Sequence, residues 1–154
     1  MIRIAILDSA VDAQKLRNCK SFQHVNLCTT DTPDTGDTLS HGTLCAMVLN
    51  ACATDYELIS VQIFNSREHK TFGDPGVLAQ ALQVCHDLGA DVINLSAATS
   101  VLSDSAMLYE VSAEAARDAI LVAALDNRRF MSIPASYPFA IGVQCAIRLC
   151  TCRK

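Results

Sequence analysis

The chain of 154 residues has the length of one ordinary domain. Hydrophobic residues make up 51% of it and charged residues 18%, a composition that can build a core and excludes a disordered protein. The net charge of −4, from 12 Lys and Arg against 16 Asp and Glu, offers no basic face for nucleic acid. No apolar run approaches the roughly 18 residues that a membrane span needs, so no membrane partner is expected.

The eight cysteines are interpreted as reduced thiols. No Cys-x-x-Cys pair occurs and no group of ligands has the short spacing of a metal site, so neither a metal nor another cofactor is expected. Cys45, Cys52 and Cys85 fall within apolar helical patterns, where a free cysteine acts as a small hydrophobic residue. Met1 leads into an apolar strand pattern rather than a signal peptide. We therefore expect a cytoplasmic protein.

Short apolar runs alternate with helical patterns along the chain. The runs rich in Ile, Val and Leu predict strands buried on both faces, at 2–7, 58–64, 91–95, 120–125 and 140–145. The segments between them predict helices at about 41–52, 76–89 and 105–119. The second helix has complete end signals, with Asp74 as cap, Pro75 in the first position and Gly89 at the end. This alternation predicts an α/β fold, a doubly wound and mostly parallel sheet with helices on both faces.

In an open parallel sheet, functional groups gather at the carboxyl ends of the strands. Asp8 ends the first predicted strand, Ser96 follows the third, and Asn127 follows the fourth. His41 begins a predicted helix. Taken singly, each has an ordinary interpretation as a turn, cap or surface residue. Their order along the chain is more informative than any one of them.

Five short segments carry a resemblance to a known family. They are Ile4-Ala5-Ile6-Leu7-Asp8-Ser9, His41-Gly42-Thr43, Asp91-Val92-Ile93-Asn94-Leu95-Ser96, Val122-Ala123-Ala124 followed by Asn127, and Pro134-Ala135-Ser136-Tyr137-Pro138. In this order, and at these places in a strand–helix pattern, the series resembles the subtilisin-like serine peptidases. The resemblance extends from residue 2 to about 143 and implies a subtilisin-like fold and peptide-bond hydrolysis.

The resemblance also implies roles for individual residues. Asp8 would be the triad carboxylate that fixes the tautomer of the histidine, and His41 would be the general base. Asn127 would donate its side-chain amide to the developing oxyanion, as the corresponding asparagine does in subtilisin. The stretch that pairs with an extended peptide substrate as an added strand corresponds to Ser96, Ala97 and Ala98.

The nucleophile of the family has no counterpart in the sequence. The triad order is Asp, His, Ser, and the Gly-Thr-Ser-x-Ala signature does not occur among the 154 residues. Ser132 and Ser136 lie in a turn-like stretch and are interpreted as turn residues. We therefore expect a shortened peptidase domain over 1–143, without its serine segment, followed by an atypical tail at 144–154. Apolar surface is then expected to be exposed near His41 and on the late strands.

Hypotheses of two classes remain. The first is a subtilisin-like serine endopeptidase domain that is inactive as an isolated chain. The second is a non-catalytic pseudoprotease that binds an extended peptide, or one half of a split protease that supplies Asp8 and His41 to a serine-bearing partner chain. A receiver-like or nucleotide-binding domain is more remote, because neither Gly-x-Gly-x-x-Gly nor Gly-Lys-Ser/Thr occurs. A hydrogen bond between Asp8 and His41 would indicate a retained pair, whereas Asp8 paired elsewhere would indicate a scaffold.

Overall fold

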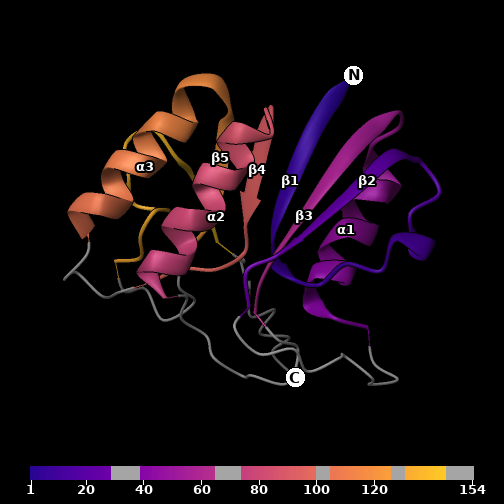
Figure 1. Cartoon of the computed structure of the whole chain (residues 1–154), viewed down its shortest axis with the longest axis horizontal. Helices are drawn as coiled ribbons and strands as arrows, with labels where there is room; N and C mark the ends of the chain where they lie inside the picture. Colours follow the sequence, from indigo (N-terminus) through magenta and orange to yellow (C-terminus); the bar gives the residue numbers. More distant parts are fainter. Residues whose placement is uncertain (29–38, 65–73, 100–104, 126–130, 145–154) are drawn as a thin grey trace, which may run out of the picture.

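The computed structural model describes residues 1–28, 39–64, 74–99, 105–125 and 131–144 (Figure 1). The elements follow one another as β1 (Ile2–Ser9), the single turn η1 (Ala13–Lys15), β2 (Cys19–Asn26), α1 (His41–Cys52), β3 (Tyr56–Phe64), α2 (Pro75–Asp87), β4 (Val92–Leu95), α3 (Ser105–Asp118), β5 (Ile120–Ala124) and β6 (Ile141–Val143). Every predicted helix and strand is present. Residues 145–154 of the predicted tail lie outside the described part of the chain.

The strands form one sheet in the order β2-β3-β1-β4-β5-β6. Each neighbouring pair is parallel, which confirms the predicted doubly wound α/β architecture. The edge strand β2 was not predicted. Among the described strands it pairs with β3 alone, and most of its side chains are exposed, so it lacks the apolar run that marks the inner strands. The strand order places β1 next to β4. Asp8 lies in β1, and Ser96 directly follows β4.

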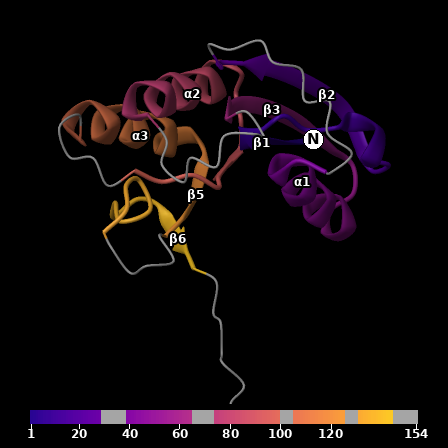
Figure 2. The same cartoon turned by 90° about the horizontal axis from the view of Figure 1, so that it is seen from below.

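The helices lie on both faces of the sheet, with α1 on one face and α2 and α3 on the other (Figure 2). Side chains of β1 and β3 alternate between these layers, as successive strand residues must. Leu7 and Val61 belong to the core under α2 and α3, whereas Ile6 and Leu58 pack with Ala46 of α1. Asp8 follows Ile6 by two residues, so its carboxylate is directed to the α1 face.

Helix α2 shows how closely local signals determine the helix ends. Asp74 accepts hydrogen bonds from the backbone N–H groups of Gly76 and Val77, and Pro75 occupies the first turn. Gly89 has a φ of +65°, the left-handed conformation that glycine adopts without strain just after a helix. These contacts confirm the predicted cap and end signals.

Apolar side chains are exposed where the sequence predicts them. On α1, one turn or more beyond His41, the exposed ones are Leu44, Met47 and Val48. On the last two strands they are Ile120, Ile141 and Val143. None of the helices in the described ranges is both long and apolar enough to cross a bilayer.

Candidate active site

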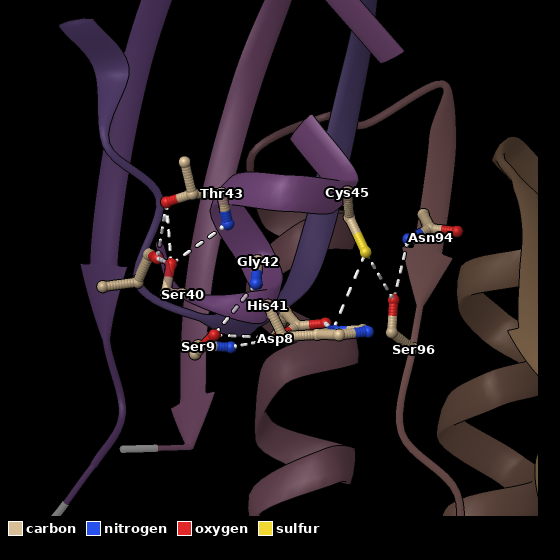
Figure 3. A network of polar contacts seen from close by, with 10 residues as sticks. Asp8, Ser9, Ser40, His41, Gly42, Thr43, Cys45, Asn94 and Ser96 are labelled. Atoms are coloured by element: carbon tan, nitrogen blue, oxygen red, sulfur yellow. Dashed lines mark hydrogen bonds and ion pairs between the residues drawn. The ribbon is translucent and has the colours of Figure 1, made fainter. Parts of the chain in front are cut away.

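Asp8 and His41 meet between the end of β1 and the start of α1. The Asp8 Oδ2 atom lies 2.7 Å from Nδ1 of His41 (Figure 3). The Asp8 side chain is 4% exposed and that of His41 is 66% exposed. With Nδ1 donating to the carboxylate, Nε2 on the far side of the imidazole ring is left as the proton acceptor. The pair therefore combines a buried carboxylate with an accessible base.

The second carboxylate oxygen of Asp8 is held by Ser9. Oδ1 accepts hydrogen bonds from the Ser9 backbone N–H at 2.6 Å and from the Ser9 hydroxyl at 3.0 Å. A buried carboxylate needs such partners because the interior does not solvate charge. Both Asp8 oxygens are thus engaged, and the carboxylate has a fixed orientation toward His41.

Hydrogen bonds join the first turn of α1 to the end of β1 and to the residues that follow it. The Gly42 N–H donates to the Ser9 hydroxyl at 2.9 Å, and the Asp12 N–H donates to Thr43 Oγ1 at 2.9 Å. Ser40 caps the helix by accepting from the Thr43 N–H at 3.1 Å, and its hydroxyl donates to the carbonyl of Ala10. These contacts set the position of His41 relative to Asp8.

Gly42 permits the close approach of helix and strand. A Cβ atom at this position would lie 2.1 Å from the carbonyl oxygen of Ser9 and 3.2 Å from the Asp8 Cβ. Backbone atoms cannot yield as a flexible side chain can, so any side chain here would push α1 away from β1. The Ser-His-Gly-Thr sequence at 40–43 therefore supplies a helix cap, the imidazole that contacts Asp8, a close approach to β1 and a hydrogen bond to Asp12.

Cys45 lies beside the pair, one helical turn after His41. Its Sγ atom is 3.7 Å from His41 Nδ1 and 3.7 Å from the Ser96 hydroxyl (Figure 3). The Ser96 hydroxyl accepts a hydrogen bond from the Asn94 side-chain amide at 3.2 Å. Burial raises the pKa of the Cys45 thiol, an effect that the Ser96 hydrogen bond partly opposes. The apolar helical pattern predicts a thiol within the hydrophobic packing, but the contacts of Cys45 are polar.

Asp8, His41 and Cys45 form a group of potential metal ligands that the sequence spacing did not indicate. Their ligand atoms all lie within 4.8 Å of one another. The signal that could have found Cys45 is its spacing from His41, because residues four apart share one side of a helix. Cys85, by contrast, is fully buried in the core and matches its predicted role, while Cys52 is exposed.

The segment expected to bind substrate leaves β4 at the same end of the sheet. Ser96 is half-buried, whereas the side chains of Ala97 and Ala98 are buried. The segment continues into Thr99, which pairs with Ile133 through an antiparallel bridge with two backbone hydrogen bonds. Asn127, the expected oxyanion donor, lies outside the described residues.

Comparisons with known proteins agree with this architecture. The model of the subtilase family matches residues 1–148. The solved structure of the prenylagaramide maturation protease PagA matches with a TM-score of 0.69 and 21% identity over 92% of this chain and 52% of that one. An S218A mutant of the protease domain of PatA gives a TM-score of 0.72 and 22% identity, covering 92% and 56% of the two chains.

The nisin leader peptidase NisP from Lactococcus lactis is similar to the same extent. It matches with a TM-score of 0.69 and 20% identity over 92% of this chain and 55% of that one. The chain thus spans about half the length of these solved relatives. The comparison with curated protein sequences finds no match. At these identities the solved structures support the fold.

Proposed function

The chain belongs to the subtilase family, and we propose that it carries the acid–base part of a subtilisin-type serine endopeptidase site. His41 is the general base and Asp8 the carboxylate that orients it. The observation that supports this proposal is the 2.7 Å contact between the buried Asp8 and an imidazole that is 66% exposed. A histidine with a purely structural role does not require both a buried carboxylate partner at one ring nitrogen and exposure of the ring to solvent.

The nucleophile in this proposal is a serine beyond these 154 residues, because the Gly-Thr-Ser-x-Ala signature does not occur among them. It is supplied either by polypeptide continuous with the chain or by a separate partner. The apolar exposure on α1, which begins at His41, supports an approach of this serine-bearing polypeptide from the side of His41.

The chemistry follows from the orientation of the imidazole. His41 Nε2 takes the serine proton as the serine oxygen attacks the peptide carbonyl, and the resulting imidazolium is stabilised by Asp8. The imidazolium then gives this proton to the leaving amine. Water then attacks the acyl carbonyl while Nε2 takes its proton, and return of this proton to the serine oxygen breaks the acyl–oxygen bond and releases the carboxylic acid. Asn127 would donate to the oxyanion, and residues 96–98 would pair with the extended peptide.

The substrate class in this proposal is an extended peptide or protein segment. Two of the similar structures are named as a maturation protease and a leader peptidase, which supports this class. A non-catalytic, peptide-binding role is the second candidate. The lack of the serine signature among the 154 residues favours it.

Hydrolysis of the activated ester p-nitrophenyl acetate tests the base without needing the serine. The rate of ester hydrolysis by the chain is expected to exceed the rates of its His41→Ala and Asp8→Asn variants by roughly tenfold, which is a modest part of the acceleration that a positioned base contributes. His24→Ala is the matched control, because His24 is also exposed but its Nδ1 contacts the Ser60 hydroxyl instead of a carboxylate. Equal rates for wild type and His41→Ala would refute a working base.

A fluorophosphonate probe then tests the origin of the nucleophile. The isolated chain is expected to remain unlabelled. In lysate of its source cell, addition of the chain should increase the labelling of a serine-bearing partner, and the His41→Ala variant should not. Labelling of the isolated chain itself would place a nucleophile among its own serines and contradict the proposal. No labelled partner, together with ester hydrolysis no faster than that of His41→Ala, would favour the non-catalytic role.

A further inference from the structure

We propose that two apolar surfaces of this chain bind a second copy of it, so that α1 of each copy covers strands β5 and β6 of the other. The first surface, the α1 stripe, consists of exposed apolar side chains on one side of the helix: Leu44, Met47, Val48 and Ala51. The second, the strand patch, consists of exposed or half-buried apolar side chains of β5 and β6: Ile120, Val122, Ile141 and Val143. The association involves no catalysis and goes beyond the proposed function.

Helix α1 is apolar on two sides. Its buried side packs on β1 and β3, where Ala46 and Leu49 belong to the same cluster as Ile6. The α1 stripe lies on another side and has the i, i+3, i+4, i+7 spacing of a helix face that is buried in the native protein. The helix contains no Asp, Glu, Lys or Arg. A surface helix ordinarily turns a charged face to water, so an uncharged helix with two apolar sides indicates that a further protein surface covers the stripe.

The sheet face on which α1 lies is covered near β1 and open toward β6. One row of paired residues crosses this face, beginning at Ile6 in β1 and passing through Asn94 and Val122 to Ile141. Ile6 is 2% exposed beneath α1, whereas Ile141 at the other end of the row is 54% exposed. The two residues between them are half-buried. Of the described helices, α1 alone lies on this face, so the strand patch is left without a helix above it (Figure 2).

The stripe and the patch fit each other but cannot meet within one chain. With 12 residues, α1 is about 18 Å long, and three neighbouring strands span about 10 Å, which is the width of one helix. The helix cannot move over β5 and β6 because its other side is already packed on β1 and β3. The α1 of a second copy can cover them, and a two-fold axis makes the two contacts identical. Neither surface contains a charged side chain, so no like charges face each other across that axis.

Sedimentation equilibrium of the reduced chain at several concentrations measures the association. A dimer of about 33 kDa, twice the 16.6 kDa of one chain, is expected. Val48→Asp in the stripe and Ile141→Lys in the patch should each raise the dissociation constant roughly 100-fold or more, because the unpaired charge is buried twice in a symmetric dimer. Met107→Asp is the matched control, since Met107 is 43% exposed on α3, on the opposite face of the sheet. It should leave the dissociation constant unchanged.

An equal mixture of the Val48→Asp and Ile141→Lys chains tests which surfaces meet. In one half of the mixed dimer, the introduced carboxylate on α1 faces the introduced ammonium group on β6. In the other half, the original Val48 and Ile141 side chains meet. The mixture should therefore recover the dimer that neither variant forms alone. All three replaced side chains are exposed, and unchanged circular dichroism of the variants excludes a loss of fold as the cause.

Several results would overturn the proposal. A wild-type chain that stays at 16.6 kDa at every concentration, or that forms larger species of no defined mass, would exclude the second copy as the occupant. Variants that stay monomeric when mixed would exclude packing of α1 on β5 and β6. The serine-bearing polypeptide approaches along the same helix, so a monomer whose binding to that polypeptide is lost in Val48→Asp would assign the stripe to it instead. Sedimentation needs no catalysis and the ester assay needs no dimer, so failure of this proposal and failure of the proposed function are distinguishable.

Discussion

Replacing Gly42 with alanine is expected to separate the two residues of the acid–base pair. The new Cβ would lie 2.1 Å from the Ser9 carbonyl oxygen, whereas ordinary van der Waals contact begins at 3.4 Å. The first turn of α1 must therefore move away from β1 by about 1.3 Å, the difference between these distances. The obstacle is backbone, so a side-chain rotation cannot remove it.

The structure gives the size of the effect. A movement of this extent along the Asp8–His41 contact would lengthen it from 2.7 Å to about 4 Å, beyond hydrogen-bond range. Overpacking costs about 1–3 kcal/mol, and a lost hydrogen bond to a charged group costs about 1.5–3 kcal/mol. We expect the free energy of unfolding to fall by about 3 kcal/mol. A misplacement near 1 Å also costs roughly 10²-fold in catalysis, so ester hydrolysis above background should disappear.

Urea unfolding gives the free energy, and long-range proton–nitrogen NMR shows which nitrogen of His41 carries hydrogen. Gly76→Ala is the matched control, because Gly76 holds the second position of α2 as Gly42 does in α1. Its added Cβ would meet only the flexible Asp74 side chain, at 3.1 Å. The control is expected to stay within about 1 kcal/mol of wild type. A Gly42→Ala chain as stable as the control, with hydrogen still on Nδ1, would refute this reasoning.

Three further outcomes follow from the same contacts. Ser40→Ala removes the α1 cap and is expected to lower the free energy of unfolding by about 1 kcal/mol in urea titration; a loss near zero would contradict the cap. Burial raises the pKa of Cys85 to about 12 from its usual 9.0. The thiol therefore ionises at a lower pH in the unfolded chain than in the folded one, and the free energy of unfolding falls above pH 9 by up to about 1.4 kcal/mol per pH unit until pH 12. Cys85→Ala should show a shallower decline between pH 9 and 10.5, and parallel profiles would contradict the shift. Because burial raises the pKa of Cys45, mass spectrometry after iodoacetamide treatment at pH 8 should find Cys52 alkylated before Cys45.

Much of the fold could be predicted because its signals are local or periodic. The α2 ends depend on residues within a few positions of each other, so the cap at Asp74 and the turn at Gly89 could be identified without the structure. The central strands β1 and β3 are buried on both faces over most of their length and show continuous apolar runs. Strand β2 could not be found in this way, because most of its side chains lie in water and it has no apolar run. The other edge strand, β6, could be predicted because its sequence is apolar, although its side chains are exposed.

The candidate site, like the fold, could be predicted from the sequence only in part. Asp8 and His41 were identified through ordered motifs, and the structure brings them into contact. The polar setting of Cys45 was missed because it arises from three separate segments: the end of β1, the first turn of α1 and the segment after β4. An apolar helical pattern does not reveal which of its residues faces a strand end. Cys52, in the same pattern, is exposed.

Within the described part of the chain, the contacts that set the Asp8–His41 distance come from two short segments, residues 8–12 and 40–43. Ser9 fixes the carboxylate, Gly42 allows the close approach, and Ser40 and Thr43 fasten the helix start. The described contacts orient the base without involving a nucleophile. The open Nε2 therefore suits a serine brought by another segment.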